Sequence, residues 1–134
     1  MLFRSLLDTN ICIYLLKGLY NLDKKIEKVG ITNCFICEIT IAELKFGVEN
    51  SRDIIRNSKV LEELINKFAI LPVFTSLDIY AREKARLRKT GTPVEDFDLL
   101  IGATAIFNNL VLVTKNISDF KRISGIFIED WTSN

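Results

Sequence analysis

The run LVLVT at residues 110–114 restricts the fold of this chain more than any other segment. All of its side chains but the last are apolar, which is typical of a strand that a parallel sheet buries on both faces. Other short apolar runs of strand length alternate along the chain with segments of helical periodicity. This alternation predicts an α/β fold, in which a central parallel sheet is flanked by helices.

The apolar runs predict strands at residues 2–7, 34–37, 110–114 and 125–131. Helical periodicity predicts helices at residues 9–17, 22–29, 40–50, 76–91 and 97–109, and one more with a core face of Ile54, Leu61, Leu64, Ile65 and Phe68. Thr9 or Asn10 is expected to cap the first helix, and Ser76 the fifth. The length of 134 residues, with no repeat or linker, predicts one domain over residues 1–134.

Composition narrows the environment and the partners of the chain. The net charge of +1 gives no overall attraction to nucleic acid, so any RNA contact must come from a local basic cluster. No apolar run approaches the roughly 20 residues of a membrane span, and MLFRSLLDTN does not resemble a signal peptide. Because 3 cysteines are an odd number, a disulfide framework is not expected either. We therefore expect a cytoplasmic protein without membrane contact.

The chain contains no histidine, which excludes Ser-His and Cys-His nucleophile pairs and imidazole-bound metals. Cys34 and Cys37 have the spacing of half a zinc site, but Cys12 is the only other thiol and two ligands are missing. Burial as small apolar residues is the simpler interpretation of the cysteines. Catalysis must then depend on carboxylates, thiols or lysines.

Three acids stand in apolar surroundings: Asp8 at the end of the first strand, Glu43 in ITIAELKFG and Asp98 in FDLLIGATAIF. Asp119, just past the LVLVT strand, is a fourth candidate. Strand carboxyl ends share one edge of a parallel sheet, so these acids are expected to gather there around Mg²⁺ or Mn²⁺. Such a site supports metal-dependent phosphodiester cleavage. Taken singly, each acid is equally well explained as a cap or a helix-face residue.

The remaining acids with polar or basic neighbours are expected to be solvated. They are Asp23, Glu27, Glu49, Asp53, Glu62, Glu63 and Glu83.

The segments LLDTNICIYLLKG, TIAELKFGV and GTPVEDFDLLIGATAIFNNLVLVTKNISDFKRISGIFIEDW resemble, in this order, the PIN-domain ribonuclease toxins of the VapC type. The resemblance implies that the metal-binding catalytic acids are Asp8, Glu43, Asp98 and Asp119, and that the polar residues of the pocket are Asn10, Thr114 and Asn116. It further implies cleavage of RNA, with tRNA or rRNA as substrate, by Mg²⁺-activated water. The resemblance also implies that the protein forms a homodimer and is inhibited by a cognate VapB-type antitoxin. Operator DNA is expected to bind only through that antitoxin.

Glu95 and Asp96 stand where this family often has small residues, so either Asp96 or Asp98 could be the third acid. Asp98 is preferred because LLIGA follows it, and Asp96 is expected on the outer turn. Two alternatives remain open. One is an aspartyl-nucleophile phosphatase, in which a second Asp is usual where this chain has Asn10. The other is a PIN-like module that binds RNA or a partner without cutting it.

A basic segment of the fifth expected helix is predicted to contact RNA phosphates, which makes RNA binding salt-dependent. Its candidate residues are Arg82, Arg86, Arg88 and Lys89.

Overall fold

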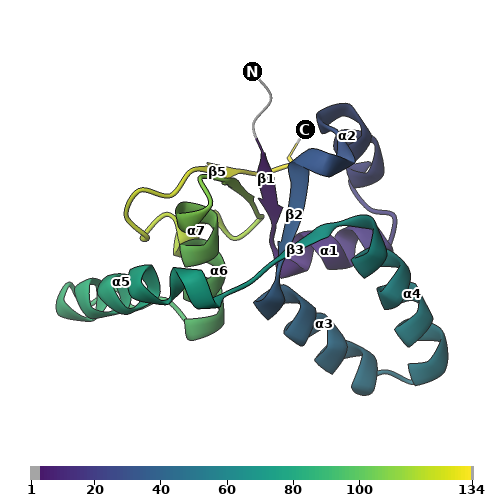
Figure 1. Cartoon of the computed structure of the whole chain (residues 1–134), viewed down its shortest axis with the longest axis horizontal. Helices are drawn as coiled ribbons and strands as arrows, with labels where there is room; N and C mark the ends of the chain where they lie inside the picture. Colours follow the sequence, from purple (N-terminus) through teal and green to yellow (C-terminus); the bar gives the residue numbers. More distant parts are fainter. Residues whose placement is uncertain (1–3, 134) are drawn as a thin grey trace.

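The computed structural model describes residues 4–133 and has the predicted α/β architecture (Figure 1). Five parallel strands form one sheet in the order β3-β2-β1-β4-β5. The strands are β1 (Ser5–Leu7), β2 (Cys34–Cys37), β3 (Ala69–Leu71), β4 (Val111–Val113) and β5 (Ile128–Glu129). The helices are α1 (Thr9–Leu16), α2 (Leu22–Val29), α3 (Glu38–Glu49), α4 (Ile54–Lys67), α5 (Leu77–Lys89), α6 (Asp96–Phe107) and α7 (Ile117–Phe120).

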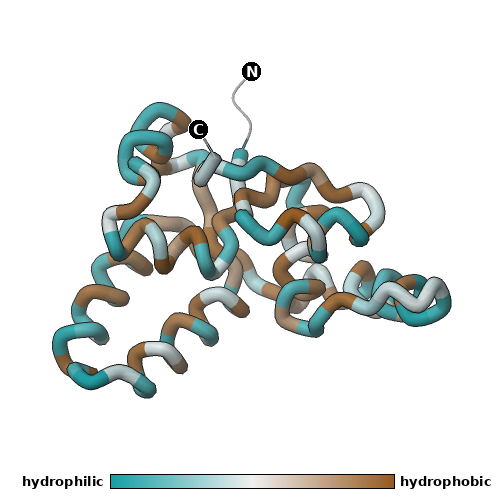
Figure 2. The backbone as a smooth tube through the Cα atoms, turned by 180° about the vertical axis from the view of Figure 1, so that it is seen from behind, coloured by the Kyte–Doolittle hydropathy of each residue, from teal (hydrophilic) through white to brown (hydrophobic). Residues whose placement is uncertain are grey.

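The sheet separates two apolar cores because successive side chains of a strand point to opposite faces. Leu7 and Val113 belong to the core beneath α1, α2 and α4, whereas Leu6 and Leu112 belong to the core beneath α5, α6 and α7. Figure 2 shows the matching pattern in the helices, where apolar and polar stretches alternate along the tube. Both faces of the sheet are therefore covered, as the apolar composition of LVLVT predicts.

The strand order places β1 in the centre of the sheet. In sequence order, β2 and then β3 are added on one side of β1, and β4 and then β5 are added on the other side. The strand order therefore reverses its direction between β1 and β4. In open α/β sheets this reversal creates the crevice in which ligands bind, at the carboxyl ends of the strands.

Several boundaries differ from the sequence prediction. Strand β3 was not predicted, because AIL directly continues the apolar pattern of the preceding helix and is followed by Pro72. The N-cap of α1 is Asp8 and not Thr9 or Asn10, since the Asp8 carboxylate accepts a hydrogen bond from the Thr9 amide. Helix α3 begins at Glu38, before the predicted start at residue 40. The predicted first strand also includes residues 2–3, which lie outside the described residues.

Two predicted side-chain roles are wrong. Ser76 precedes α5 but makes no capping hydrogen bond, and its hydroxyl is buried without a partner among the described residues. Ile54, predicted to be in the core, is 42% exposed at the start of α4, where the chain has just left the body of the molecule. The other end of the α4 face is buried as predicted, with Leu61, Leu64 and Phe68 in the core.

The cysteines are all free and buried, as predicted. Cys34 and Cys37 are separated by an odd number of strand positions and point into opposite cores. The pair therefore cannot ligate one metal ion. In residues 4–133, no helix is both long and apolar enough to cross a bilayer.

Two helical glycines offer a matched test of packing. A Cβ added to Gly102 in α6 would lie 2.5 Å from Ile123 Cδ1, whereas a Cβ on Gly47 in α3 would meet no atom within 4 Å. We expect Gly102→Ala to lower the free energy of unfolding by about 1–3 kcal/mol through overpacking. Gly47→Ala should raise it by roughly 0.5–1 kcal/mol because alanine restricts the unfolded chain. Urea unfolding followed by Trp131 fluorescence measures both, and equal effects would contradict this packing.

Candidate functional site

Asp8 lies directly after β1 and is only 4% exposed. Its Oδ1 accepts a hydrogen bond from the Thr9 amide at 2.7 Å, and its Oδ2 accepts one from the Thr114 hydroxyl at 2.7 Å. The Asp8 amide donates to the Val113 carbonyl at 3.0 Å. Thr114 follows β4, so these bonds hold the carboxylate between β1 and β4, where the strand order reverses.

Glu43 lies in the second turn of α3, five residues after the helix begins at Glu38. Its Oε1 accepts a hydrogen bond from the Thr9 hydroxyl at 2.6 Å. The same hydroxyl lies 3.0 Å from the hydroxyl of Thr40, which is fully buried. Thr9 therefore connects the two acids, since its amide binds Asp8 and its hydroxyl binds Glu43.

Asp98 is the third residue of α6 and is half-buried. Asp96, two residues earlier, is exposed on the outer side of the helix, as expected, and pairs with Lys84 at 2.8 Å. Among residues 4–133, no basic side chain lies within ion-pair distance of Asp98. The surroundings of these two acids thus differ, and those of Asp98 are the ones expected of a metal ligand.

Asp119 is in α7 and is more exposed than Asp8. Its Oδ2 accepts a hydrogen bond from Asn116 Nδ2 at 3.1 Å, and its Oδ1 lies 3.8 Å from Arg122 Nη1. The Asn116 amide in turn donates to the Thr114 hydroxyl at 3.0 Å. Two of the three predicted pocket residues are therefore part of one hydrogen-bonded chain from Asp8 to Asp119. The third, Asn10, is exposed in the first turn of α1.

The pKa shifts indicate that the four acids share one electrostatic site. Burial raises the pKa of Asp8 above its ordinary value, and the negative charge of Glu43 adds to the rise. The pKa of Asp98 is raised to about 6, mainly by burial and further by nearby negative charges, which in order of effect are those of Asp8, Glu95, Glu43 and Asp119. Carboxylates that raise one another's pKa in this way are stabilised by a cation.

The donors fit a hard divalent ion, because all are carboxylate or hydroxyl oxygens. Mg²⁺ or Mn²⁺ would be held by Asp8, Glu43 and Asp98, with Asp119 in support. As described, however, no three acid or thiol side chains of residues 4–133 are grouped closely enough to hold one ion. Binding of an ion by three of these acids would require their carboxylates to approach one another more closely.

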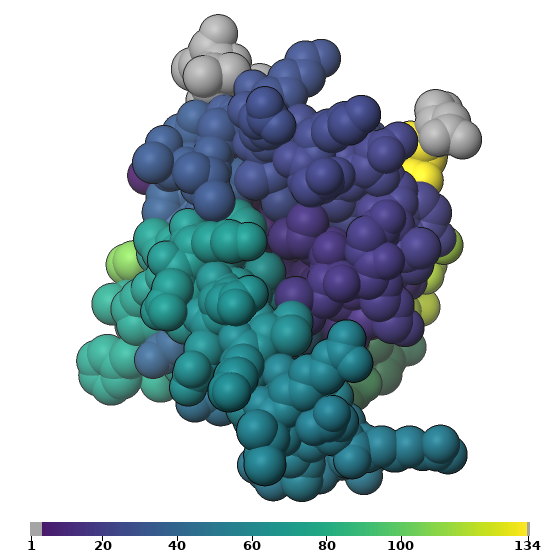
Figure 3. Space-filling model, turned by 90° about the vertical axis from the view of Figure 1, so that its right-hand side faces the viewer, coloured from purple at the N-terminus to yellow at the C-terminus, as the bar shows by residue number. Residues whose placement is uncertain are grey.

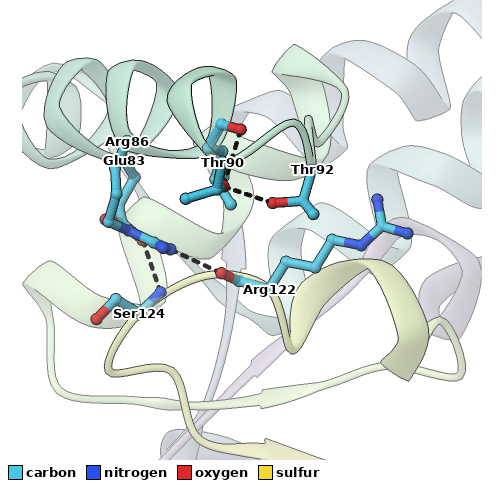
Figure 4. Close-up of polar contacts among 7 residues, drawn as sticks. Glu83, Arg86, Thr90, Thr92, Arg122 and Ser124 are labelled. Atoms are coloured by element: carbon cyan, nitrogen blue, oxygen red, sulfur yellow. Dashed lines mark hydrogen bonds and ion pairs between the residues drawn. The ribbon is translucent and has the colours of Figure 1, made fainter.

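Sequence reasoning missed Glu83, which was expected to be solvated. Its side chain is only 12% exposed and accepts hydrogen bonds from Arg86 Nε at 2.8 Å and from the Ser124 amide at 2.6 Å. Arg86 also donates to the Arg122 carbonyl at 2.7 Å, so α5 is tied to the segment after α7 (Figure 4). The spacing of Glu83 and Arg86, three residues apart on one helix, is the only sequence signal of this pair.

This network changes the expectation for the basic helix. The guanidinium of Arg86 is engaged in contacts within the molecule, although its side chain is 42% exposed, and its hydrogen bond lowers the pKa of Glu83. Arg82, Arg88 and Lys89 are exposed on α5, and their contact with RNA phosphates stays a prediction.

A family model described as the PIN domain matches residues 5–126. The chain is 35% identical over 131 residues to the tRNA(fMet)-specific endonuclease VapC of Salmonella typhimurium, covering 97% of this chain and 99% of that protein. It is 33% identical over 132 residues to ribonuclease VapC2 of Rickettsia felis, covering 94% and 96%. A crystal structure of DNA-bound VapBC from Salmonella typhimurium superposes with a TM-score of 0.90 at 34% identity, over 96% of this chain and 98% of that one.

The chain therefore belongs to the PIN-domain family and, within it, to the VapC type. The resemblance seen in the sequence motifs is confirmed. Membership of this family also removes the aspartyl-nucleophile phosphatase from consideration.

The raised pKa of Asp98 predicts how stability depends on pH in chelator-treated protein. Between the ordinary value of 3.8 and about 6, the folded state retains a proton that the unfolded state has released. The free energy of unfolding should therefore fall as pH rises through this window. Asp98→Asn removes the penalty, so it should raise the thermal midpoint at neutral pH and have less effect below the window.

Asp96→Asn is the matched control for this measurement. Lys84 lowers the pKa of Asp96, so the contribution of this acid to stability has the opposite sign. Its replacement should not raise the midpoint at neutral pH. Equal thermal midpoints for wild type and Asp98→Asn at all pH values between 3.8 and about 6 and at neutral pH would contradict the raised pKa of Asp98.

Proposed function

We propose that this chain is a metal-dependent endoribonuclease and the toxin of a VapBC-type pair. The observation that supports the proposal is that Thr9 joins Asp8 to Glu43 beside the reversal point of the sheet, that the charges of both acids raise the pKa of Asp98, and that none of the three is in an ion pair among the described residues. A divalent ion bound there lowers the pKa of water and stabilises charge on the departing oxygen. The ribonuclease and endonuclease names of the relatives support RNA as the substrate.

The protein's own side chains prepare this site. The Thr9 amide and the Thr114 hydroxyl hold both oxygens of Asp8, so the carboxylate cannot turn away from the crevice. The Thr9 hydroxyl holds one oxygen of Glu43 and leaves the other free of a side-chain partner among the described residues. The joint negative charge repels RNA phosphates until a cation is bound. We infer that RNA binding is coupled to metal binding, and that tRNA is the first substrate to test.

Replacing aspartate by asparagine removes the negative charge of a side chain but nearly keeps its shape. Asp8→Asn and Asp98→Asn should lower RNA cleavage about a hundredfold or more, because several kcal/mol of charge stabilisation is lost. The fold should survive, since asparagine also caps helices. Chelation should abolish cleavage by wild type, and Mg²⁺ or Mn²⁺ should restore it. The assay is cleavage of purified tRNA and rRNA, with new 5′ ends mapped and with thermal midpoints measured in parallel.

Asp96→Asn again provides the control, because it makes the same chemical change two residues away on the same helix. It should retain cleavage. Full activity of Asp8→Asn or Asp98→Asn, or loss in Asp96→Asn alone, would sink the assignment of the acids. If wild type binds RNA but never cuts it in the presence of either metal, the chain is a non-cleaving PIN-like module instead.

We also propose a VapB-type antitoxin as partner, with operator DNA bound only through it. Two apolar cavities flank α1, of about 460 Å³ towards Glu43 and about 440 Å³ towards α2. Figure 3 shows this face, with α1 between α2 and α4. An antitoxin segment seated in both cavities passes beside Glu43 and blocks the acids. Light scattering on the free toxin and on its complex with the antitoxin tests whether the toxin is a homodimer.

Val60 offers a test of this docking surface, because it lines both cavities and is 37% exposed. Val60→Glu places a charge in the apolar surface and should weaken inhibition by the co-expressed antitoxin at least about tenfold. RNA cleavage by the free toxin should stay unchanged, since Val60 is not part of the acid site. Inhibition as strong as that of wild type would show that the antitoxin binds elsewhere.

A further inference from the structure

Lys115, Tyr14 and Tyr20 form a cluster at the carboxyl end of β4. The Lys115 ammonium donates a hydrogen bond to the Tyr20 hydroxyl at 3.2 Å and lies 5.3 Å from the centre of the Tyr20 ring and 5.9 Å from that of Tyr14. The two rings meet edge to face, with centroids 5.2 Å apart. The fold thus brings a lysine next to two aromatic rings that lie far from it in the sequence.

The cluster faces solvent and carries free positive charge. Lys115 is exposed, Tyr20 is 40% exposed, and no carboxylate of residues 4–133 lies within 4.0 Å of the ammonium. Asp130 is the acid whose charge Lys115 senses, but its Oδ1 is bound to the amide and hydroxyl of Thr132. The ammonium is therefore available to an anion from outside the molecule.

The backbone at Tyr20 is strained. Tyr20 and Asn21 both have positive φ, at 60° and 53°, in the turn between α1 and α2. Asparagine accepts this left-handed conformation readily, whereas tyrosine pays a steric cost for it. A large exposed ring is therefore held at a position where glycine or asparagine would be less strained, and such strain is concentrated at functional sites.

The position of the cluster connects it to the acids. Lys115 directly follows Thr114, whose hydroxyl binds Asp8, and Tyr14 lies on the helix that Asp8 caps. The cluster therefore begins one residue along the chain from a group that binds Asp8. Bases of single-stranded RNA commonly stack on aromatic side chains while basic side chains bind the neighbouring phosphates.

We propose that Tyr14, Tyr20 and Lys115 form a nucleotide platform, on which one unpaired base of the RNA stacks on Tyr20 while Lys115 binds an adjacent phosphate. The platform deepens the proposed function and rests on it, because it names unpaired RNA as the form of the substrate. Tyr14 supports the Tyr20 ring from the side. Stacking of this kind tolerates any base, so the platform positions the strand and does not select its sequence.

The test measures binding of a fluorescent single-stranded RNA by anisotropy, in Mg²⁺, with Asp98→Asn present throughout so that the RNA is not cut. Tyr20→Asn removes the ring and relieves the strain, so loss of binding cannot be attributed to unfolding. It should weaken binding about five- to tenfold, within the range of one lost stack. Tyr20→Phe keeps the ring and should bind within about twofold of the parent. Lys115→Gln should weaken binding and flatten its salt dependence.

An abasic RNA of the same length separates the two contacts. Without a base to stack, Tyr20→Asn should no longer differ from the parent, whereas Lys115→Gln should still bind more weakly. The chain also offers a matched control in Lys84, which makes a similar contact with Tyr80 on α5 but is paired with Asp96. Lys84→Gln removes the same charge and should leave the affinity of the parent unchanged.

The outcomes distinguish the platform from the wider proposal. If the Asp98→Asn parent binds RNA and wild type cuts it, but Tyr20→Asn and Lys115→Gln bind like the parent, the platform is wrong and the ribonuclease stands. Equal losses in Lys115→Gln and Lys84→Gln would also overturn it, because they indicate a general charge effect. If neither wild type cuts RNA nor the parent binds it, the proposed function itself has failed.

Discussion

Burial of the Asp8 carboxylate costs free energy, and the contacts at the carboxyl edge of the sheet reduce that cost. The Thr9 amide and the Thr114 hydroxyl each satisfy one oxygen, but neither brings a positive charge. Both donors belong to segments that directly follow central strands, so the hydrogen bonds also fix α1 and the chain after β4 in place. What hydrogen bonds cannot supply is neutralisation, and a cation can supply it.

The layered fold could be predicted from the sequence because strand length and apolar character are local signals. LVLVT is apolar enough to require burial on both faces, and the structure places its strand between β1 and β5. Strand β3 was missed because its residues directly continue the apolar pattern of α4, so no separate strand signal stands out. The cap of α1 was assigned to Thr9 or Asn10 although it is Asp8, and Ser76 stands at the N-cap of α5 without a capping hydrogen bond. Capping depends on which side chain reaches the amides and not on residue type alone.

For the site, the expected outer position of Asp96 is confirmed, because Asp96 is exposed and paired with Lys84 whereas Asp98 is half-buried. The choice of Asp98 as a metal ligand stays a prediction. The same reasoning failed for Glu83. Its neighbours are basic, yet its partner Ser124 comes from a segment 41 positions later in the chain. The cluster of Tyr20 and Lys115 escaped notice for the same reason, since its members are 95 positions apart. Contacts of this kind depend on how the helices are placed, which composition does not reveal.

The pairing of β1 with β4 has a consequence for biosynthesis. The threonine hydroxyl that completes the hydrogen bonding of Asp8 is synthesised 106 positions after it. Asp98 and Asp119 also follow most of the chain. While the intervening chain is made, a growing polypeptide therefore carries Asp8 without the β4 strand and the threonine hydroxyl that complete its surroundings. Because parallel pairing over such a distance comes late in folding, the site stays incomplete while its own messenger is being read.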